Sequence, residues 1–128
     1  MKEPKWVLRE VVCAAHEQSL AQFGGAAGLR DEGLLDSALG RPPNLFAYGK
    51  PSLFDLAASY AFGIVKNHPF VDGNKRTGFI VAVVFLELNG YQFRASEVDA
   101  TLQTLALAAG DMSEAAFSEW LKARSKRA

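Results

Sequence analysis

The run from His68 to Gly78 gathers, within eleven residues, side chains suited to chemistry on a phosphate group. His68 is the side chain type best able to accept a proton near neutral pH. Asp72 could hold Mg²⁺, which prefers one or two carboxylates together with phosphate oxygens and water. Each also has a purely structural interpretation, since His68 could end one helix and Asp72 could cap the next.

The next four residues add a cradle for an anion. Gly73 lets the backbone approach a ligand or take a positive φ. Asn74 is either a turn residue or an amide donor to phosphate. Lys75 and Arg76 would oppose the macrodipole at the start of a helix, unless a bound anion offset them. Because several structural explanations would have to coincide in so few residues, the run favours a phosphate site.

Two apolar helices must position this loop. The earlier one begins at Ser52, which pairs with Asp55 as a variant of the capping box, and it ends near Asn67. The later one runs from Lys75 to about Asn89 and stops at Gly90. Both are apolar on most sides, which indicates central, buried helices and a rigid mount for the loop.

The rest of the chain predicts four more helices and almost no sheet. The first helix should bury Leu8, Val11, Val12, Ala15, Leu20 and Phe23. The second should stop at Gly40, because Pro42 and Pro43 forbid continuation. The predicted helices span residues 7–23, 31–39, 96–109 and 113–123; residues 41–44 are irregular, 45–49 an extended segment or β flap, and 91–94 a brief strand. We therefore expect an all-α, six-helix fold in one domain, residues 1–128.

Composition excludes several function classes. The 128 residues carry 14 Lys plus Arg and 14 Asp plus Glu, so the net charge is zero, which argues against nucleic-acid binding. The basic tail, residues 122–127, is interpreted as the last turn of a helix. Cys13 is the only cysteine and is expected to be buried. The N-terminus lacks a signal-peptide core and no stretch could span a membrane, so we expect a cytoplasmic protein.

The loop differs from the common phosphate-binding motifs. The Walker pattern and the protein-kinase set are absent. The loop instead resembles the Fic motif in its Doc (death-on-curing) variant, the toxin branch of some bacterial toxin–antitoxin pairs. The matching residues are His68, Pro69, Phe70, Asp72, Gly73, Asn74 and Arg76, with the branch-specific Lys75. His16, residues 24–25, 29–35 and 44–48, and Thr77 also look like Doc-type proteins, so the resemblance covers about residues 7–123.

The resemblance implies a Fic fold that uses ATP and Mg²⁺ at the loop. His68 would be the general base for a protein hydroxyl and Asp72 would position Mg²⁺. Gly73, Asn74, Lys75 and Arg76 would bind the phosphates. The product would be a phosphorylated Ser or Thr on a bacterial protein, with a translation factor expected as the target.

Two departures from the wider family bear on the chemistry. Phe79 stands where Fic AMP-transferases carry a second arginine, and Lys75 replaces their glycine, so both argue against ordinary AMP transfer. The inhibitory pattern [S/T]-x-x-x-E-[G/N] is missing, since residues 28–33 lack its Ser or Thr. An antitoxin with a helical tail in an apolar groove near the first helix and the loop is therefore expected. AMP transfer and a catalytically silent anion- or peptide-binding module remain the alternatives.

Overall fold

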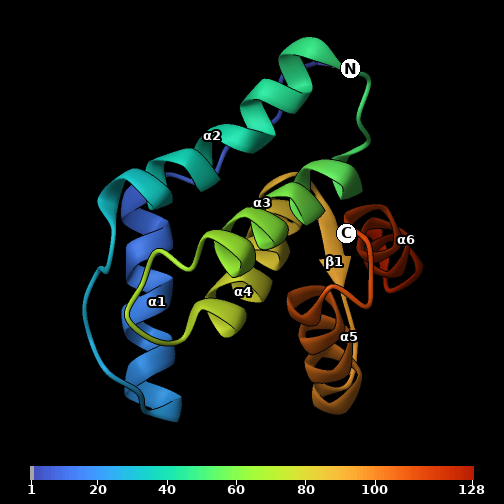
Figure 1. The fold of residues 1–128 in the computed structure, drawn as a ribbon. Helices are drawn as coiled ribbons and strands as arrows, with labels where there is room; N and C mark the ends of the chain where they lie inside the picture. Colours follow the sequence, from blue (N-terminus) through green and yellow to red (C-terminus); the bar gives the residue numbers. More distant parts are fainter. Residues whose placement is uncertain (1) are drawn as a thin grey trace.

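The computed structural model describes residues 2–128 and confirms the predicted all-α fold (Figure 1). Within these residues it has six helices and one small sheet. The elements are α1 (Arg9–Phe23), α2 (Glu32–Tyr48), α3 (Leu53–Asn67), α4 (Asn74–Leu88), β1 (Tyr91–Phe93), α5 (Glu97–Ala109), α6 (Glu114–Ala123) and β2 (Ser125–Arg127). No helix in the described part of the chain is long and apolar enough to cross a bilayer.

Helix α3 is the centre of the fold, with α2, α4 and α6 packed around it. Its predicted capping box is present, because Ser52 accepts from Asp55 N–H and Asp55 accepts from Ser52 N–H. Glycines allow the closest approaches. A Cβ on Gly63 would lie 3.2 Å from Ala38, and one on Gly78 would lie 2.9 Å from a Val65 methyl. These contacts fix α2 and α4 against α3, so both ends of the loop have a rigid mount.

Helix α2 corrects the predicted stop at Gly40. The helix starts at Asp31 as expected, with the carboxylate accepting from Leu34 N–H, but it continues through Pro42 and Pro43 to Tyr48. Proline inside a helix costs about 3 kcal/mol. Tertiary contacts offset that cost, because Pro42 is buried and Arg41 donates to the Ser59 carbonyl of α3 and pairs with Glu114 of α6.

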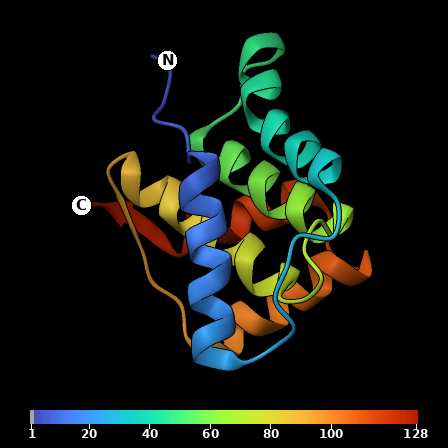
Figure 2. The same ribbon diagram turned by 90° about the vertical axis from the view of Figure 1, so that its left-hand side faces the viewer.

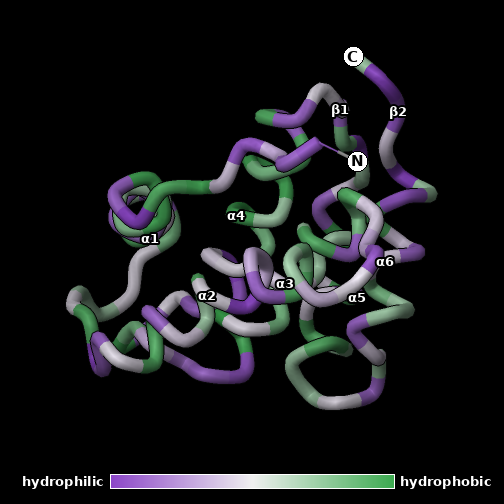
Figure 3. The backbone as a smooth tube through the Cα atoms, turned by 90° about the horizontal axis from the view of Figure 1, so that it is seen from above, coloured by the Kyte–Doolittle hydropathy of each residue, from purple (hydrophilic) through white to green (hydrophobic). Residues whose placement is uncertain are grey.

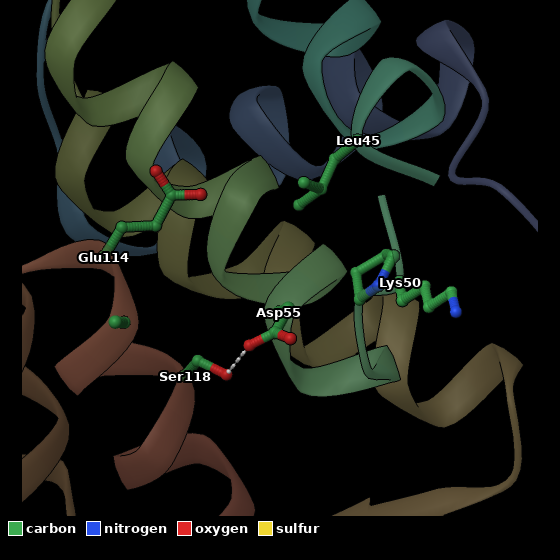
Figure 4. A pocket seen from close by; sticks show the side chains of 7 residues that line it. Leu45, Lys50, Asp55, Glu114 and Ser118 are labelled. Atoms are coloured by element: carbon green, nitrogen blue, oxygen red, sulfur yellow. Dashed lines mark hydrogen bonds between the residues drawn. The ribbon is translucent and has the colours of Figure 1, made fainter. Parts of the chain in front are cut away.

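The β flap predicted within residues 45–49 is also wrong. Leu45 belongs to the last turns of α2. With Lys50 it borders a hollow of about 430 Å³ beside Asp55 and Ser118, at the N-terminal end of α3 (Figure 4). His68 lies at the other end of this 15-residue helix, about 22 Å away along its axis. The segment is therefore remote from the His68 loop.

The expected strand at residue 91 forms, and it finds a partner that the sequence did not indicate. Tyr91 pairs with Arg127 and Phe93 with Ser125 in an antiparallel sheet. The basic tail beyond Ala123 is thus a strand, not the last turn of α6. The Arg127 guanidinium lies 5.6 Å from the centre of the Tyr91 ring, a cation–π contact that accounts for one of the tail cations.

Helix α1 buries only part of the predicted face: Val12 is buried, Ala15 and Leu20 are half-buried, and Val11 is exposed. Val12, His16 and Ser19 are buried, at i, i+4 and i+7, while Leu8 is 62% and Phe23 53% exposed. Cys13 is half-buried, although a buried thiol was expected. Hydrophilic and hydrophobic stretches alternate around α1 (Figure 3). The polar residues face inward because they hold the loop, which pure hydrophobic patterning cannot anticipate.

Candidate active site

The loop from His68 to Gly73 joins the C-terminus of α3 to the N-terminus of α4, as predicted. His68 is the C-cap of α3 and has left-handed backbone angles, φ 55° and ψ 54°. His68 is exposed and lines a cleft beside the loop. An exposed imidazole at the rim of a cleft is accessible to a protein hydroxyl, as a general base must be.

Asp72 is held by backbone donors from two sides. Oδ2 accepts from Ala26 N–H at 3.2 Å, and Oδ1 accepts from Gly73 N–H at 2.8 Å. These two hydrogen bonds, the Ala26 one foremost, lower the pKa of Asp72 below its usual 3.8, and the charges of Arg76 and His68 add to the effect. The carboxylate is therefore ionised at neutral pH and exposed, as a Mg²⁺ ligand would be.

The start of α4 is open toward the cleft. Gly73 is the N-cap with φ 78°, and it supplies no capping side chain. The N–H groups of Asn74, Lys75 and Arg76 belong to the first turn and have no intrahelical acceptors. A Cβ on Gly73 would lie 3.3 Å from Leu20, so glycine suits both the backbone angle and the space. This end of α4 can bind an anion through backbone donors and dipole.

Of the two interpretations of Asn74, the structure agrees with the turn residue, because its side chain bonds within the loop. It is 2% exposed, and its amide closes the loop by accepting from Phe70 N–H and donating to Phe70 C=O, both at 2.9 Å. The side chain therefore serves as a staple between loop and helix. What Asn74 can offer a phosphate is its backbone N–H.

The side chains of Lys75 and Arg76 have different surroundings. Lys75 is exposed, lines the cleft and makes no hydrogen bond or ion pair within residues 2–128. Arg76 donates from Nε to Ser19 Oγ and from Nη2 to Gly24 C=O, both at 3.1 Å, and its guanidinium lies over the Phe23 ring. Lys75 is thus an exposed charge at the cleft without a side-chain partner among residues 2–128, whereas Arg76 mainly ties the end of α1 to α4.

The cleft has a volume of about 600 Å³, enough for a nucleotide-sized ligand. The loop and the first turn of α4 form one side; Phe23, Phe79 and Ile80 with α5 residues Glu97, Ala100, Thr101, Thr104 and Leu105 form the rest. Thr104 is 5% exposed, and its hydroxyl has no hydrogen-bond partner among the described residues. A buried, unpaired hydroxyl beside a cleft is a group that a ligand could satisfy.

Phe79 also belongs to an aromatic cluster behind the cleft. Its ring centre lies 5.7 Å from that of Phe93 and 6.3 Å from that of Trp120. The position that carries a second arginine in the wider family is thus apolar and packed against the β1–α6 side of the molecule.

Sequence reasoning named His16 and residues 29–35 as similar to Doc-type proteins, but it missed that they hold the loop from outside. His16 stacks on Phe70, with ring centres 3.8 Å apart, and its Nε2 lies 2.8 Å from Asp72 C=O, so it donates there. The segment before α2 runs beside the loop (Figure 2), where Leu29 forms a β-bridge with Phe70. The available signal was the resemblance of His16 and residues 29–35 to Doc-type proteins.

Comparison with known proteins gives a consistent picture. The model of the Fic/DOC family matches residues 6–86. Toxin Doc of Mycolicibacterium smegmatis is 46% identical over 76 residues, which are 57% of this chain and 58% of that protein. Protein kinase doc of Escherichia phage P1 is 32% identical over 114 residues, 88% of this chain and 90% of the phage protein.

Proposed function

The chain belongs to the Fic/DOC family, in its Doc branch, and we propose that it is a toxin that phosphorylates a Ser or Thr hydroxyl of a bacterial protein. ATP with Mg²⁺ is the proposed donor, and a translation factor in the cytoplasm is the proposed target. The observation that carries the proposal is the exposed His68 beside an ionised Asp72 and an open helix N-terminus, all on one cleft. The names of the two relatives, a toxin and a protein kinase, support it.

The residues fit a nucleotide with its metal. No cluster of three or more His, Cys, Asp or Glu occurs in the described chain, so a metal bound by protein ligands alone is not provided. Asp72 alone suits Mg²⁺, which takes its remaining ligands from phosphate oxygens and water and would neutralise charge on the transferred group. The α4 N-terminus and Lys75 would hold phosphate oxygens, and the unpaired Thr104 hydroxyl is available to another part of the ligand.

In the proposed reaction this chain supplies a base and fixed charges. The His68 imidazole takes the proton of the target hydroxyl as its oxygen attacks the terminal phosphorus, and ADP leaves with the bridging oxygen. Backbone N–H groups of α4 and the Lys75 ammonium stabilise the charge on the phosphoryl oxygens. Asn74 and His16 hold the loop rigid while this happens. Lys75 in place of glycine and Phe79 in place of arginine favour phosphoryl over AMP transfer.

Labelled ATP separates the two chemistries. Incubation with a cell lysate and ATP labelled in either the γ- or the α-phosphate should give a labelled protein only with the γ-label. Label from the α-phosphate would instead establish AMP transfer. Absence of transfer together with absence of calorimetric ATP binding would establish the silent binding module. His68→Asn is the matched control, because asparagine is among the side-chain-bearing residues that best tolerate the left-handed backbone; the change should abolish transfer without unfolding the protein.

We further propose that an antitoxin with a helical tail binds beside this cleft. Exposed apolar residues support such a site: Phe23 ends α1, and Val98, Leu102 and Leu105 recur at i, i+4 and i+7 along α5. An amphipathic helix could lay its apolar face there. We expect a small reading frame beside the gene to encode this antitoxin; co-expression with it should restore growth, and Leu102→Glu should remove that protection while leaving toxicity intact. Growth that stays inhibited by the wild type despite co-expression would count against the partner.

A further inference from the structure

Arg30 binds two carbonyl groups at the junction between α3 and the loop. Its Nε donates to His68 C=O at 2.7 Å, and its Nη2 donates to Asn67 C=O at 3.0 Å. Carbonyls at the end of a helix have no intrahelical donors, and a cation there also complements the negative end of the macrodipole. The forked guanidinium therefore caps α3 at the residue that carries the imidazole.

His68 needs such support because its backbone is unfavourable. It is the one non-glycine residue with a positive φ in the described chain. It also precedes Pro69, and residues before proline prefer extended angles. A side-chain-bearing residue in the left-handed region persists only where its surroundings impose that conformation. The direction of the His68 carbonyl is set by ψ, so a donor fixed on this oxygen restricts the backbone angle directly.

Arg30 is itself anchored by the start of α2. The backbone N–H groups of Arg30 and Asp31 both donate to Pro69 C=O, at 2.7 and 3.0 Å. Val71 N–H donates back to Gly28 C=O at 3.0 Å. Asp31 is also the N-cap of α2. The guanidinium thus projects from a segment that is bonded to the loop on one side and to a packed helix on the other.

We infer that Arg30 is the positioning residue of His68. It holds the left-handed C-cap so that the imidazole stands at the rim of the cleft, and it is absent from the residues that line the cleft. The inference rests on the proposed function only where it calls His68 the base. The claim about backbone geometry is independent of any activity.

The test compares Arg30→Ala and Arg30→Lys with Arg41→Ala. Arg41 is the matched control, since it also donates to a carbonyl of α3, that of Ser59 at 3.0 Å, but far from the loop. In Arg30→Ala, kcat for phosphoryl transfer should fall by about 10- to 100-fold with KM for ATP unchanged, as expected for a misplaced reacting group. Arg30→Lys should recover part of the rate, because it keeps the charge but lacks the fork. Arg41→Ala should change thermal stability alone.

A second readout needs no activity. The one-bond coupling between the backbone nitrogen and Cα of His68 reports ψ by NMR, and it should depart from the wild-type value in Arg30→Ala but not in Arg41→Ala. An unchanged coupling in Arg30→Ala would overturn the inference, even if the wild type transferred nothing. If the wild type shows no transferase activity but the coupling changes in Arg30→Ala, the positioning role is upheld and only the proposed function is refuted. Equal kcat in Arg30→Ala and the wild type would likewise overturn the inference.

Discussion

Substitution of Asn74 by alanine separates a structural from a ligand-binding role for this residue. The change leaves the buried N–H and C=O of Phe70 without partners. Each orphaned buried group costs about 1–3 kcal/mol, so the two together should lower the free energy of unfolding by about 2–6 kcal/mol. The total for a domain is about 5–15 kcal/mol, and the variant should still fold. For 128 residues even the lower figure corresponds to a fall in Tm of about 8 °C.

The assay pairs thermal unfolding with calorimetric titration of ATP and Mg²⁺. Lys75→Ala is the adjacent control, because Lys75 is exposed and has no side-chain partner in the described chain. It should leave Tm within about 2 °C of the wild type, as for a surface change of up to 0.5 kcal/mol, yet weaken ATP binding. Asn74→Ala, in contrast, should lower the Tm strongly even in the absence of ATP.

The refuting result is clear for each half of the comparison. If Asn74→Ala melts at the wild-type temperature while its affinity for ATP falls, the side chain is a phosphate ligand and the staple is not formed in solution. If Lys75→Ala binds ATP as the wild type does, the free charge at the cleft is not a phosphate ligand.

Two further outcomes follow from the carboxylates and from the cleft wall. Hydrogen bonds from Trp120 and Gln103 lower the pKa of Asp99, and those from Ala26 and Gly73 lower the pKa of Asp72. A carboxylate whose pKa is lowered by folding stabilises the folded state at a pH above its unfolded pKa of about 4. It loses that effect as the pH falls through the lower folded pKa. The urea midpoint should therefore drop as the pH falls below about 5 toward the lowered folded pKa values, and Asp99→Asn should flatten the slope; a midpoint independent of pH would contradict this. Thr104→Val removes an unpaired buried hydroxyl, so the Tm should stay equal or rise by a few degrees. The KM for ATP should rise several-fold. A large loss of stability in the free protein would show that the hydroxyl already has a partner.

Local signals were enough to predict the framework that carries the loop. Ser52 with Asp55, Asp31, and Ser96 with Asp99 are caps in the structure, because a cap depends on residues three positions apart. The two apolar helices on either side of the loop were equally evident from composition. The order of the reactive side chains along the loop was also readable, since it is contiguous in sequence.

Long-range contacts account for what could not be predicted. Pro42 is tolerated because α2 packs on α3, and His16 is buried because the loop needs its donor. Neither requirement is visible within the helix concerned. Arg30 is a stronger case: its partners lie 37 and 38 positions away, so no local pattern ties it to His68.

The spacing inside the loop has a mechanical explanation that the side-chain types alone do not suggest. Asn74 bonds both polar groups of the residue four positions earlier, so the loop is closed by its own motif. That closure brings the end of α3 against the beginning of α4, with Asp72 between them. The motif therefore contains two kinds of residue: Asn74 and Arg76 use their side chains to hold the scaffold, whereas His68, Asp72 and Lys75 keep theirs exposed or at the cleft. An insertion anywhere between Phe70 and Asn74 would break the closure and misplace together the three groups that the proposed reaction uses, so that reaction would require a fixed spacing and not merely a fixed composition.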